Sequence, residues 1–415
     1  MNEQQILTHT YPSGLTLIVE PMQDVQSAAF SLLVPSGCIY DPPEQEGCAS
    51  LMADWIMRGA GPLDNQALTN ALDNLGLQRN EGVGSSHLSF TGATVAEALP
   101  AALRIYADVV LRPHFPDDQF AAAQAGIEQT LMALEDEPRQ KILIELRQRS
   151  FDAPWGRPTE GTLEGIRSLT ADSVRAHYQR CFRPTDAILG IAGNVDPKQM
   201  VDLVGELFNG WEPRPAPVTI AGPRGPQRDH LHHESTQTQI GIAYDSVSYR
   251  DDGYYAAWAA VGVLSGGMSA RLFTEVREKR GLCYSVFASL NSLRDQGRVF
   301  CYAGTTAERA QETLEVTLNE LMRLGEGIGE DELQRCQARA KSSLIMQQES
   351  SAARSSSIAR DWYYLGRVTS LAEVREKIES LTIPALLDHI HAHPARNFTI
   401  LTLGPAPLEV PSGVS

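Results

Sequence analysis

An arginine and a tyrosine that lie close together in the sequence could form a hydrogen-bonding site for an extended peptide. Arg277 lies near the end of a predicted helix, and Tyr284 lies in the strand predicted to follow it. Gly281 stands between them, where a left-handed residue commonly ends a helix. Such a turn could direct both side chains into one cleft. The guanidinium and the phenolic hydroxyl would then donate to peptide carbonyls, or to an oxyanion formed from one.

The sequence around this pair resembles the C-terminal half of the pitrilysin/insulinase family, the zinc peptidases with an inverted metal motif. The resemblance covers a glycine-rich approach, Ser-x-Arg-Leu-Phe, Arg-Glu-Lys and Gly-Leu-x-Tyr-Ser, in that order, within residues 266–286. It implies that Arg277 and Tyr284 are catalytic-site residues that bind the substrate and its transition state. The structural alternative is a surface arginine beside a half-buried tyrosine.

The resemblance also implies a zinc helix near the N-terminus, and the chain keeps the frame of that helix without its ligands. The inverted motif, His-x-x-Glu-His, places two zinc-binding histidines on one helical face and a glutamate that activates water. Here the frame is residues 47–49 and 58–60, and the three motif positions hold Ser50, Ala53 and Asp54. We therefore expect no metal in this chain, because Ala53 cannot accept a proton and Asp54 alone is a poor zinc ligand.

The third zinc ligand of the family is a glutamate on a later helix, and its position falls at or near Thr130. Glu128 lies two residues away, about 200° around a helix, so it is expected to point elsewhere. A register error of one or two residues would bring Glu128 into the site. The chain is therefore expected to have a degenerate metal motif at Ser50, Ala53, Asp54 and Thr130.

Composition and charge exclude several classes of partner. The chain has 415 residues, enough for two domains, and 42% of them are hydrophobic. A formal net charge of -16 argues against a nucleic-acid partner and against an anionic membrane surface. The six cysteines are scattered, which is typical of a reduced, intracellular protein. No signal peptide is visible, so a cytoplasmic location is expected, or a periplasmic one if a signal was trimmed.

The order of predicted elements indicates two copies of one α+β unit. Leu75-Gly76-Leu77 corresponds to Arg280-Gly281-Leu282, and Gly92-Ala93-Thr94 corresponds to Gly304-Thr305-Thr306, each of the latter pair ahead of a long helix. A proline-rich linker at residues 213–228 separates an expected N-terminal domain, residues 1–212, from a C-terminal domain, residues 229–415. The family resemblance implies that each domain is a mainly antiparallel sheet covered by helices, and that the two form half of a clam-shell chamber.

Other residues with catalytic or ligand chemistry form no recognised pattern. Two histidine groups, at residues 230–233 and 389–393, could bind metal weakly, but the simpler interpretation is that they are solvated. His87 is interpreted as a structural residue. No Gly-x-Ser-x-Gly elbow supports a serine nucleophile. The glycine-rich stretch at residues 262–267 lacks the lysine of a phosphate-binding loop.

These observations favour a non-catalytic, substrate-binding subunit of a heterodimeric zinc metallopeptidase that degrades or processes peptides. Such a chain would not be active alone. Its partner would be a homologous subunit that carries His-x-x-Glu-His and the zinc, its substrates would be peptides, and a homodimer is possible. The alternative from another class is a structural core, scaffold or peptide-binding protein with no proteolytic role. A third reading is a homodimeric peptidase with unusual metal ligands.

Overall fold

The computed structural model describes residues 4–412 and 414, and the chain divides into two compact units. Neither unit is continuous in sequence. Unit 1 combines Met1–Ala133, Ala153–Ala221 and Ile345–Thr369. Unit 2 combines Leu134–Asp152, Gly222–Leu344 and Ser370–Ser415. Each half of the chain therefore contributes a segment to the unit formed mainly by the other half.

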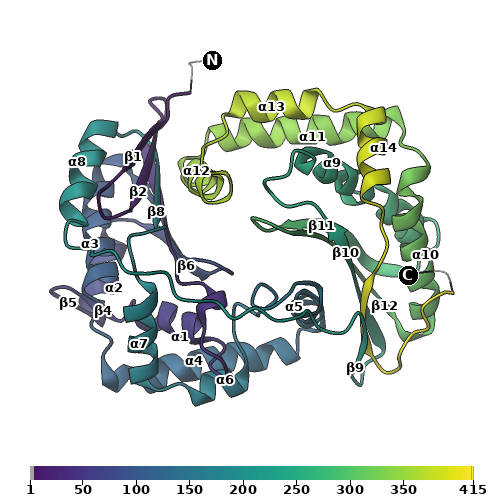
Figure 1. The fold of residues 1–415 in the computed structure, drawn as a ribbon, viewed down its shortest axis with the longest axis horizontal. Coiled ribbons are helices and arrows are strands. Elements are labelled where there is room, and N and C mark those ends of the chain that lie inside the picture. Colours follow the sequence, from purple (N-terminus) through teal and green to yellow (C-terminus); the bar gives the residue numbers. More distant parts are fainter. Residues whose placement is uncertain (1–3, 413, 415) are drawn as a thin grey trace. The chain divides into compact units, whose positions relative to one another are not determined.

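Unit 1 contains a six-stranded sheet, called sheet 1 below (Figure 1). Its strands lie in the order β1-β2-β8-β3-β7-β6, and only β2 and β8 pair in parallel. The strands are β1 (Leu7–Thr10), β2 (Thr16–Pro21), β8 (Ile188–Gly193), β3 (Ser27–Val34), β7 (Leu88–Val95) and β6 (Gln78–Val83). A short pair, β4 (Gly59–Ala60) with β5 (Leu63–Asp64), stands apart.

Unit 2 contains a five-stranded sheet, sheet 2, with the same topology. Read from its parallel pair, the order is β9-β13-β10-β12-β11, which matches β2-β8-β3-β7-β6 of sheet 1. The strands are β9 (Arg228–His232), β13 (Thr399–Gly404), β10 (Gln237–Ser246), β12 (Gly297–Thr306) and β11 (Cys283–Ser292). The repeat inferred from short sequence matches is therefore present as a shared strand order.

Helices cover both sheets. Those of unit 1 are α1 (Cys48–Trp55), α2 (Asn65–Asn74), α3 (Leu99–Leu111), most of α4 (Asp117–Glu135), α6 (Leu163–Ser168), α7 (Ala171–Cys181), α8 (Pro197–Leu207) and α12 (Ser351–Leu365). Those of unit 2 are α5 (Pro138–Ser150), α9 (Tyr254–Ser265), the π-helix η3 (Phe273–Glu278), α10 (Ala310–Met322), most of α11 (Glu330–Gln348), α13 (Leu371–Glu379) and α14 (Ile383–Ala392). Within the described residues, no helix has both the length and the apolar character to cross a bilayer.

Helices α12 and α5 occupy equivalent places on the two sheets. Helix α12 packs against β3 and β8, and α5 packs against β10 and β13 (Figure 1). Glycines on the central strands permit this approach. A Cβ at Gly190 would lie 2.4 Å from the backbone oxygen of Ser355 in α12, and Gly241 lies directly beneath Ile142 and Leu146 of α5.

A buried ion pair fixes α12 on sheet 1. The guanidinium of Arg354 donates two hydrogen bonds, of 3.0 and 2.8 Å, to one carboxylate oxygen of Glu20 on β2. The amide of Gln4 donates to the other oxygen at 2.8 Å. The side chains of Arg354 and Glu20 are only 2% and 7% exposed. In unit 2, the buried Arg298 of β12 donates from Nε to the backbone oxygen of Ser150 at the end of α5, at 2.9 Å.

The predicted fold class is confirmed, since both units are sheets covered by helices. The helix expected within the frame at residues 47–49 and 58–60 is α1, Cys48–Trp55. The compact units differ from the contiguous division at residues 213–228, because α5 and α12 each pack on the sheet formed mainly by the other half of the chain. Residues 212–221 form no helix or strand and are largely exposed, as expected for a connecting segment.

Replacing Arg354 by alanine is expected to destabilise unit 1 by about 3–5 kcal/mol, because Glu20 would remain buried without its cation. Denaturant unfolding would measure the loss. Arg360→Ala, at an exposed position of the same helix, should cost far less.

The double change Glu20→Leu with Arg354→Met should recover much of the stability, because two apolar side chains leave no unpaired charge. If Arg354→Ala unfolded no more easily than Arg360→Ala, the ion pair would not be what holds α12.

Candidate functional site

The arginine of the predicted peptide-binding pair lies on a π-helical turn. Residues Phe273–Glu278 adopt this wider helix, in which Val276 is fully buried in the core of unit 2. π-Helical segments are uncommon and are frequent at functional sites. Gly281 ends the turn with φ of +59°, and its N–H donates to the carbonyl of Arg277 at 3.0 Å. The left-handed glycine expected from the sequence is therefore present.

The tyrosine lies at a β-bulge on the edge of sheet 2. Strand β11 is the edge strand, and its pairing with β12 shifts register between Cys283 and Ser285, so Tyr284 has no partner opposite it. Bulges re-aim side chains and are frequent beside active sites. The Tyr284 side chain is 84% exposed, which is far more than the half-buried alternative predicted.

The structure brings Arg277 and Tyr284 together. The guanidinium carbon of Arg277 lies 5.4 Å from the ring centroid of Tyr284 and 4.8 Å from that of Phe273. Cation–π contacts with two rings restrain the guanidinium. Within the described part of the chain, the Arg277 guanidinium has no ion-pair or hydrogen-bond partner. Its donors therefore remain free for a ligand.

The degenerate metal-motif positions border a cavity in unit 1. Ser50, Ala53 and Asp54 project from one side of α1 into a polar cavity of about 410 Å³. Strand β6, at the edge of sheet 1, contributes Arg79 and Glu81. The helical face predicted for the motif is therefore the face that borders this cavity.

The fourth expected position does not join the other three. Thr130 is exposed, and its hydroxyl donates to the backbone oxygen of Gly126 at 3.0 Å. The residue of α4 that borders the cavity is Ile127. Glu128, which a register error would have brought into the site, lies 3.3 Å from the guanidinium of Arg167 in an ion pair.

The residues at the motif positions do not fit a zinc ion. The carboxylate of Asp54 is held by Arg58 at 2.7 Å, and the other two positions offer a hydroxyl and a methyl group. Glu81 and Glu160 also border the cavity. Among the described residues, however, the carboxylates here do not converge to the separation that metal ligands need. No catalytic step through a metal can therefore be assigned to this cavity.

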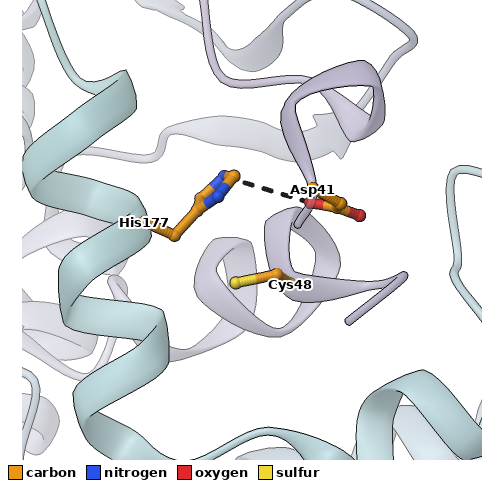
Figure 2. A group of neighbouring side chains, drawn as sticks. All are labelled: Asp41, Cys48 and His177. Atoms are coloured by element: carbon orange, nitrogen blue, oxygen red, sulfur yellow. Dashed lines mark ion pairs between the residues drawn. The ribbon is translucent and has the colours of Figure 1, made fainter. Parts of the chain in front are cut away.

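Three buried polar side chains lie next to the N-terminus of α1 (Figure 2). Asp41 follows the short 3-10 turn η1 (Cys38–Tyr40), Cys48 is the first residue of α1, and His177 comes from α7. Their potential ligand atoms all lie within 4.8 Å of one another. This cluster was not predicted from the sequence. The available signal was the helical spacing of Val174, His177 and Cys181, which places His177 on the buried face of α7.

Hydrogen bonding gives the cluster a structural role. The two carboxylate oxygens of Asp41 accept the backbone N–H groups of Gly47 and Ala49, at 2.8 and 2.9 Å, and so cap α1. The guanidinium of Arg180 donates to Nδ1 of His177 at 2.9 Å, so Nε2 carries the imidazole hydrogen. A metal at Nε2 would need the lone pair that this hydrogen occupies. The arrangement therefore holds α1 in place and does not suit a cation.

Burial perturbs the protonation of this cluster in two directions. It lowers the pKa of His177 to about 3, helped by the positive charge of Arg180. Burial raises the pKa of Asp41 to about 7, although the two backbone N–H groups and the charge of Arg157 lower it. Burial also raises the pKa of the Cys48 thiol well above its ordinary value. A thiol in this state is not a nucleophile.

The other histidines weighed from the sequence lie apart from both candidate sites. His230 accepts or donates through Nδ1 to the Thr402 hydroxyl at 2.8 Å on the outer strands of sheet 2. His87 is buried and lies edge-on to Tyr363, 4.5 Å between ring centroids. His389 and His393 border a separate pocket of unit 2, described below.

Two family models match most of the chain. The model described as insulinase (peptidase family M16) matches residues 17–163, and the model described as peptidase M16 inactive domain matches residues 168–340. An uncharacterized zinc protease of Streptomyces coelicolor is 26% identical over 385 residues, 90% of this chain and 84% of that relative. An uncharacterized zinc protease of Bacillus subtilis is 24% identical over 383 residues, 91% of this chain and 93% of that relative.

Solved structures share the fold over nearly the whole length. The crystal structure of a peptidase M16 inactive domain from Pseudomonas fluorescens matches with a TM-score of 0.89 at 20% identity, covering 98% of this chain and 99% of that one. A chain of complex III2 from Candida albicans matches with a TM-score of 0.82 at 18% identity, covering 97% and 96%. At these identities the likeness concerns the fold.

The contribution of His177 to the stability of unit 1 is expected to fall as the pH falls below about 6.5. The unfolded chain binds a proton there, and the folded chain, with a His177 pKa of about 3, does not. The loss from this residue should reach about 2 kcal/mol by pH 5. Asp41 acts in the opposite direction between its unfolded and folded pKa values, so the test compares variants.

Denaturant unfolding of the unchanged protein and of His177→Gln, at pH 7 and pH 5, measures the effect. The variant should lose less stability than the unchanged protein between the two pH values. His114→Gln, at an exposed histidine of the same unit, should behave as the unchanged protein does. Equal pH dependence in all three proteins would contradict the assignment.

Proposed function

Because this chain belongs to peptidase family M16, the pitrilysin/insulinase family, we propose that it is the non-catalytic, substrate-binding subunit of a two-chain zinc peptidase. The zinc would be held by a homologous partner subunit that carries His-x-x-Glu-His. This chain would contribute Arg277 and Tyr284 to the shared site. The substrates would be peptides, which the complex degrades or processes.

One observation carries the proposal: Arg277 and Tyr284 lie together and can reach a ligand, while the zinc-motif positions hold residues that do not bind zinc. Arg277 is fixed by two aromatic rings and has no described partner for its donors, and Tyr284 is 84% exposed. A protein with a purely structural role gains nothing from an arginine held in this way. At the motif positions, Asp54 is already neutralised by Arg58, and Ala53 has no group that could activate water.

Each side chain of the pair has a distinct task in this proposal. The planar guanidinium of Arg277 can donate two parallel hydrogen bonds to a peptide carbonyl and to the oxyanion that forms from it. The hydroxyl of Tyr284 can donate one more. Donors fixed before the reaction stabilise the developing negative charge without reorganising. Activation of the water belongs to the partner subunit.

A structural role is the alternative. It is supported by the fold shared with a chain of complex III2 from Candida albicans, and by the replaced metal positions, which a scaffold tolerates. A scaffold or peptide-binding protein would form complexes without changing any hydrolysis. The same experiment separates the two functions.

The test combines this chain with a zinc-motif homologue encoded in the same genome. Hydrolysis of a quenched fluorescent peptide is measured for each chain alone and for the mixture, and the zinc content of each preparation is recorded. Hydrolysis only in the mixture, with zinc in the homologue, is the expected result. Hydrolysis and stoichiometric zinc in this chain alone would overturn the proposal. Complex formation with no gain in hydrolysis would favour the scaffold.

Arg277→Ala is expected to lower kcat of the mixture by about 10²–10³, the cost of losing a donor to a developing oxyanion. Tyr284→Phe should lower it by about ten- to a hundredfold, through one lost hydrogen bond to a charged group. The steady-state hydrolysis rate, measured with saturating peptide, checks both values.

Lys279→Ala is the control within the same segment, because the Lys279 side chain is 59% exposed and, among the described residues, pairs with Glu275 alone. Its mixture should keep full activity. Size-exclusion chromatography would show that every variant still forms the complex. Full activity of both Arg277→Ala and Tyr284→Phe would remove the pair from the site.

A further inference from the structure

Unit 2 also contains a pocket at the C-terminal end of β10, where neither Arg277 nor Tyr284 borders it. It has a volume of about 270 Å³ and lies between α9, α14 and the end of α10, over β10 and β12. We call it the Tyr244 pocket. The residues used below are Tyr244, Ala257, Ala260, Met322, His389 and His393. This volume is just below the range of about 300–1,000 Å³ usual for ligand sites, so an occupant must be small.

Tyr244 brings a hydroxyl donor to this pocket. The residue is 7% exposed and packs against Phe398, with 5.8 Å between ring centroids. Among the described residues, its hydroxyl has no hydrogen-bond partner in the chain, yet it is not one of the fully buried unpartnered polar atoms. The hydroxyl is therefore accessible from the pocket, where it can donate to a bound molecule.

The walls of the pocket are mostly apolar, although Ser246 also borders it. Ala257 and Ala260 follow one another at helical spacing on α9, and their small side chains leave the space open. The core residues Val261, Leu321 and Ile390 complete the walls. Met322 borders the pocket and is 42% exposed, an unusual state for a large apolar side chain. A flexible thioether in this position adapts to apolar ligands.

Among the described residues, those that border the pocket include imidazoles and no lysine or arginine. His389 and His393 lie with ring centroids 4.8 Å apart, and burial together with His393 lowers the pKa of His389, so His389 is neutral at pH 7. The acidic side chains nearby are Glu326, which borders the pocket, and Asp251, which acts on His389. Arg323 is occupied by Glu320 and Glu326, at 3.0 and 3.2 Å. This environment disfavours an anionic ligand.

We infer that the Tyr244 pocket binds a small, uncharged amphipathic molecule: an apolar chain or ring with one hydrogen-bond acceptor that receives the Tyr244 hydroxyl. The apolar part lies against the alanines of α9 and Met322. The acceptor takes the hydrogen bond that the Tyr244 hydroxyl offers to the pocket. The site is independent of Arg277 and Tyr284 and of any peptidase activity.

Isothermal titration calorimetry with octanamide tests the inference on the full chain. Octanamide carries an eight-carbon apolar chain and a neutral acceptor, and octanoate is its anionic match. Octanamide should bind with one site per chain at pH 7, and octanoate should bind more weakly because of Glu326 and Asp251. Tyr244→Phe should weaken octanamide binding about three- to tenfold, the effect of one lost hydrogen bond.

Two further variants make the result specific to this pocket. Ala257→Met fills the space from α9 and should abolish octanamide binding while keeping or raising the Tm, since it occupies a void. Tyr178→Phe removes another largely buried phenol, whose hydroxyl donates to Val110 in unit 1, and should leave octanamide binding unchanged.

Three results would overturn the inference. The first is no heat of binding for octanamide at millimolar concentration. The second is equal binding by the unchanged protein, Tyr244→Phe and Ala257→Met, which would place the probe elsewhere. The third is tighter binding of octanoate than of octanamide, which would contradict the uncharged ligand. A large fall in Tm for Ala257→Met would show that the space on α9 is already filled.

Discussion

The buried ion pair between Glu20 and Arg354 is the contact on which the rest of unit 1 depends. A charged pair this deep in a protein is not chosen for its stability alone, because the cost of removing both charges from water offsets much of their attraction. It does specify one partner and one register. Helix α12 must place Arg354 over β2 and Ser355 over Gly190 at the same time, and no shifted position of the helix satisfies both. The exchange of α12 and α5 between the two halves of the chain follows from contacts of this kind between residues distant in sequence.

Three irregular backbone features position the candidate substrate-binding pair. A π-helical turn sets the spacing of Phe273 and Arg277, a left-handed Gly281 reverses the chain, and a bulge at Tyr284 turns the ring outward. Each device departs from regular structure, and each is placed within twelve residues of sequence, 273–284. The core beneath them is regular, with Leu272 and Val276 fully buried. A rigid core beneath an irregular surface segment is the usual arrangement for a binding site.

Much of this could be predicted from the sequence because it depends on neighbours in the chain. Gly281, the α1 frame and the repeated strand pattern are local signals, and the structure contains all three. The placement of α12 could not be predicted, since it depends on Glu20 and Gly190, which lie more than a hundred and fifty residues from α12. Which residue of α4 borders the cavity also could not be predicted. It is Ile127, about one helical turn before the expected Thr130.

The exchange of α12 and α5 between the two halves of the chain also affects the order in which the protein can fold during synthesis. Strand β8 of sheet 1 ends at Gly193, but the helix that covers it ends at Leu365, and a ribosome adding about 5–20 residues per second needs roughly ten to thirty-five seconds for the interval. Helix α5 is complete at Ser150 and waits longer, until β13 ends at Gly404. During translation, sheet 1 therefore exists for a time without α12, and α5 exists without sheet 2. Neither unit is complete until the second half of the chain has been synthesised.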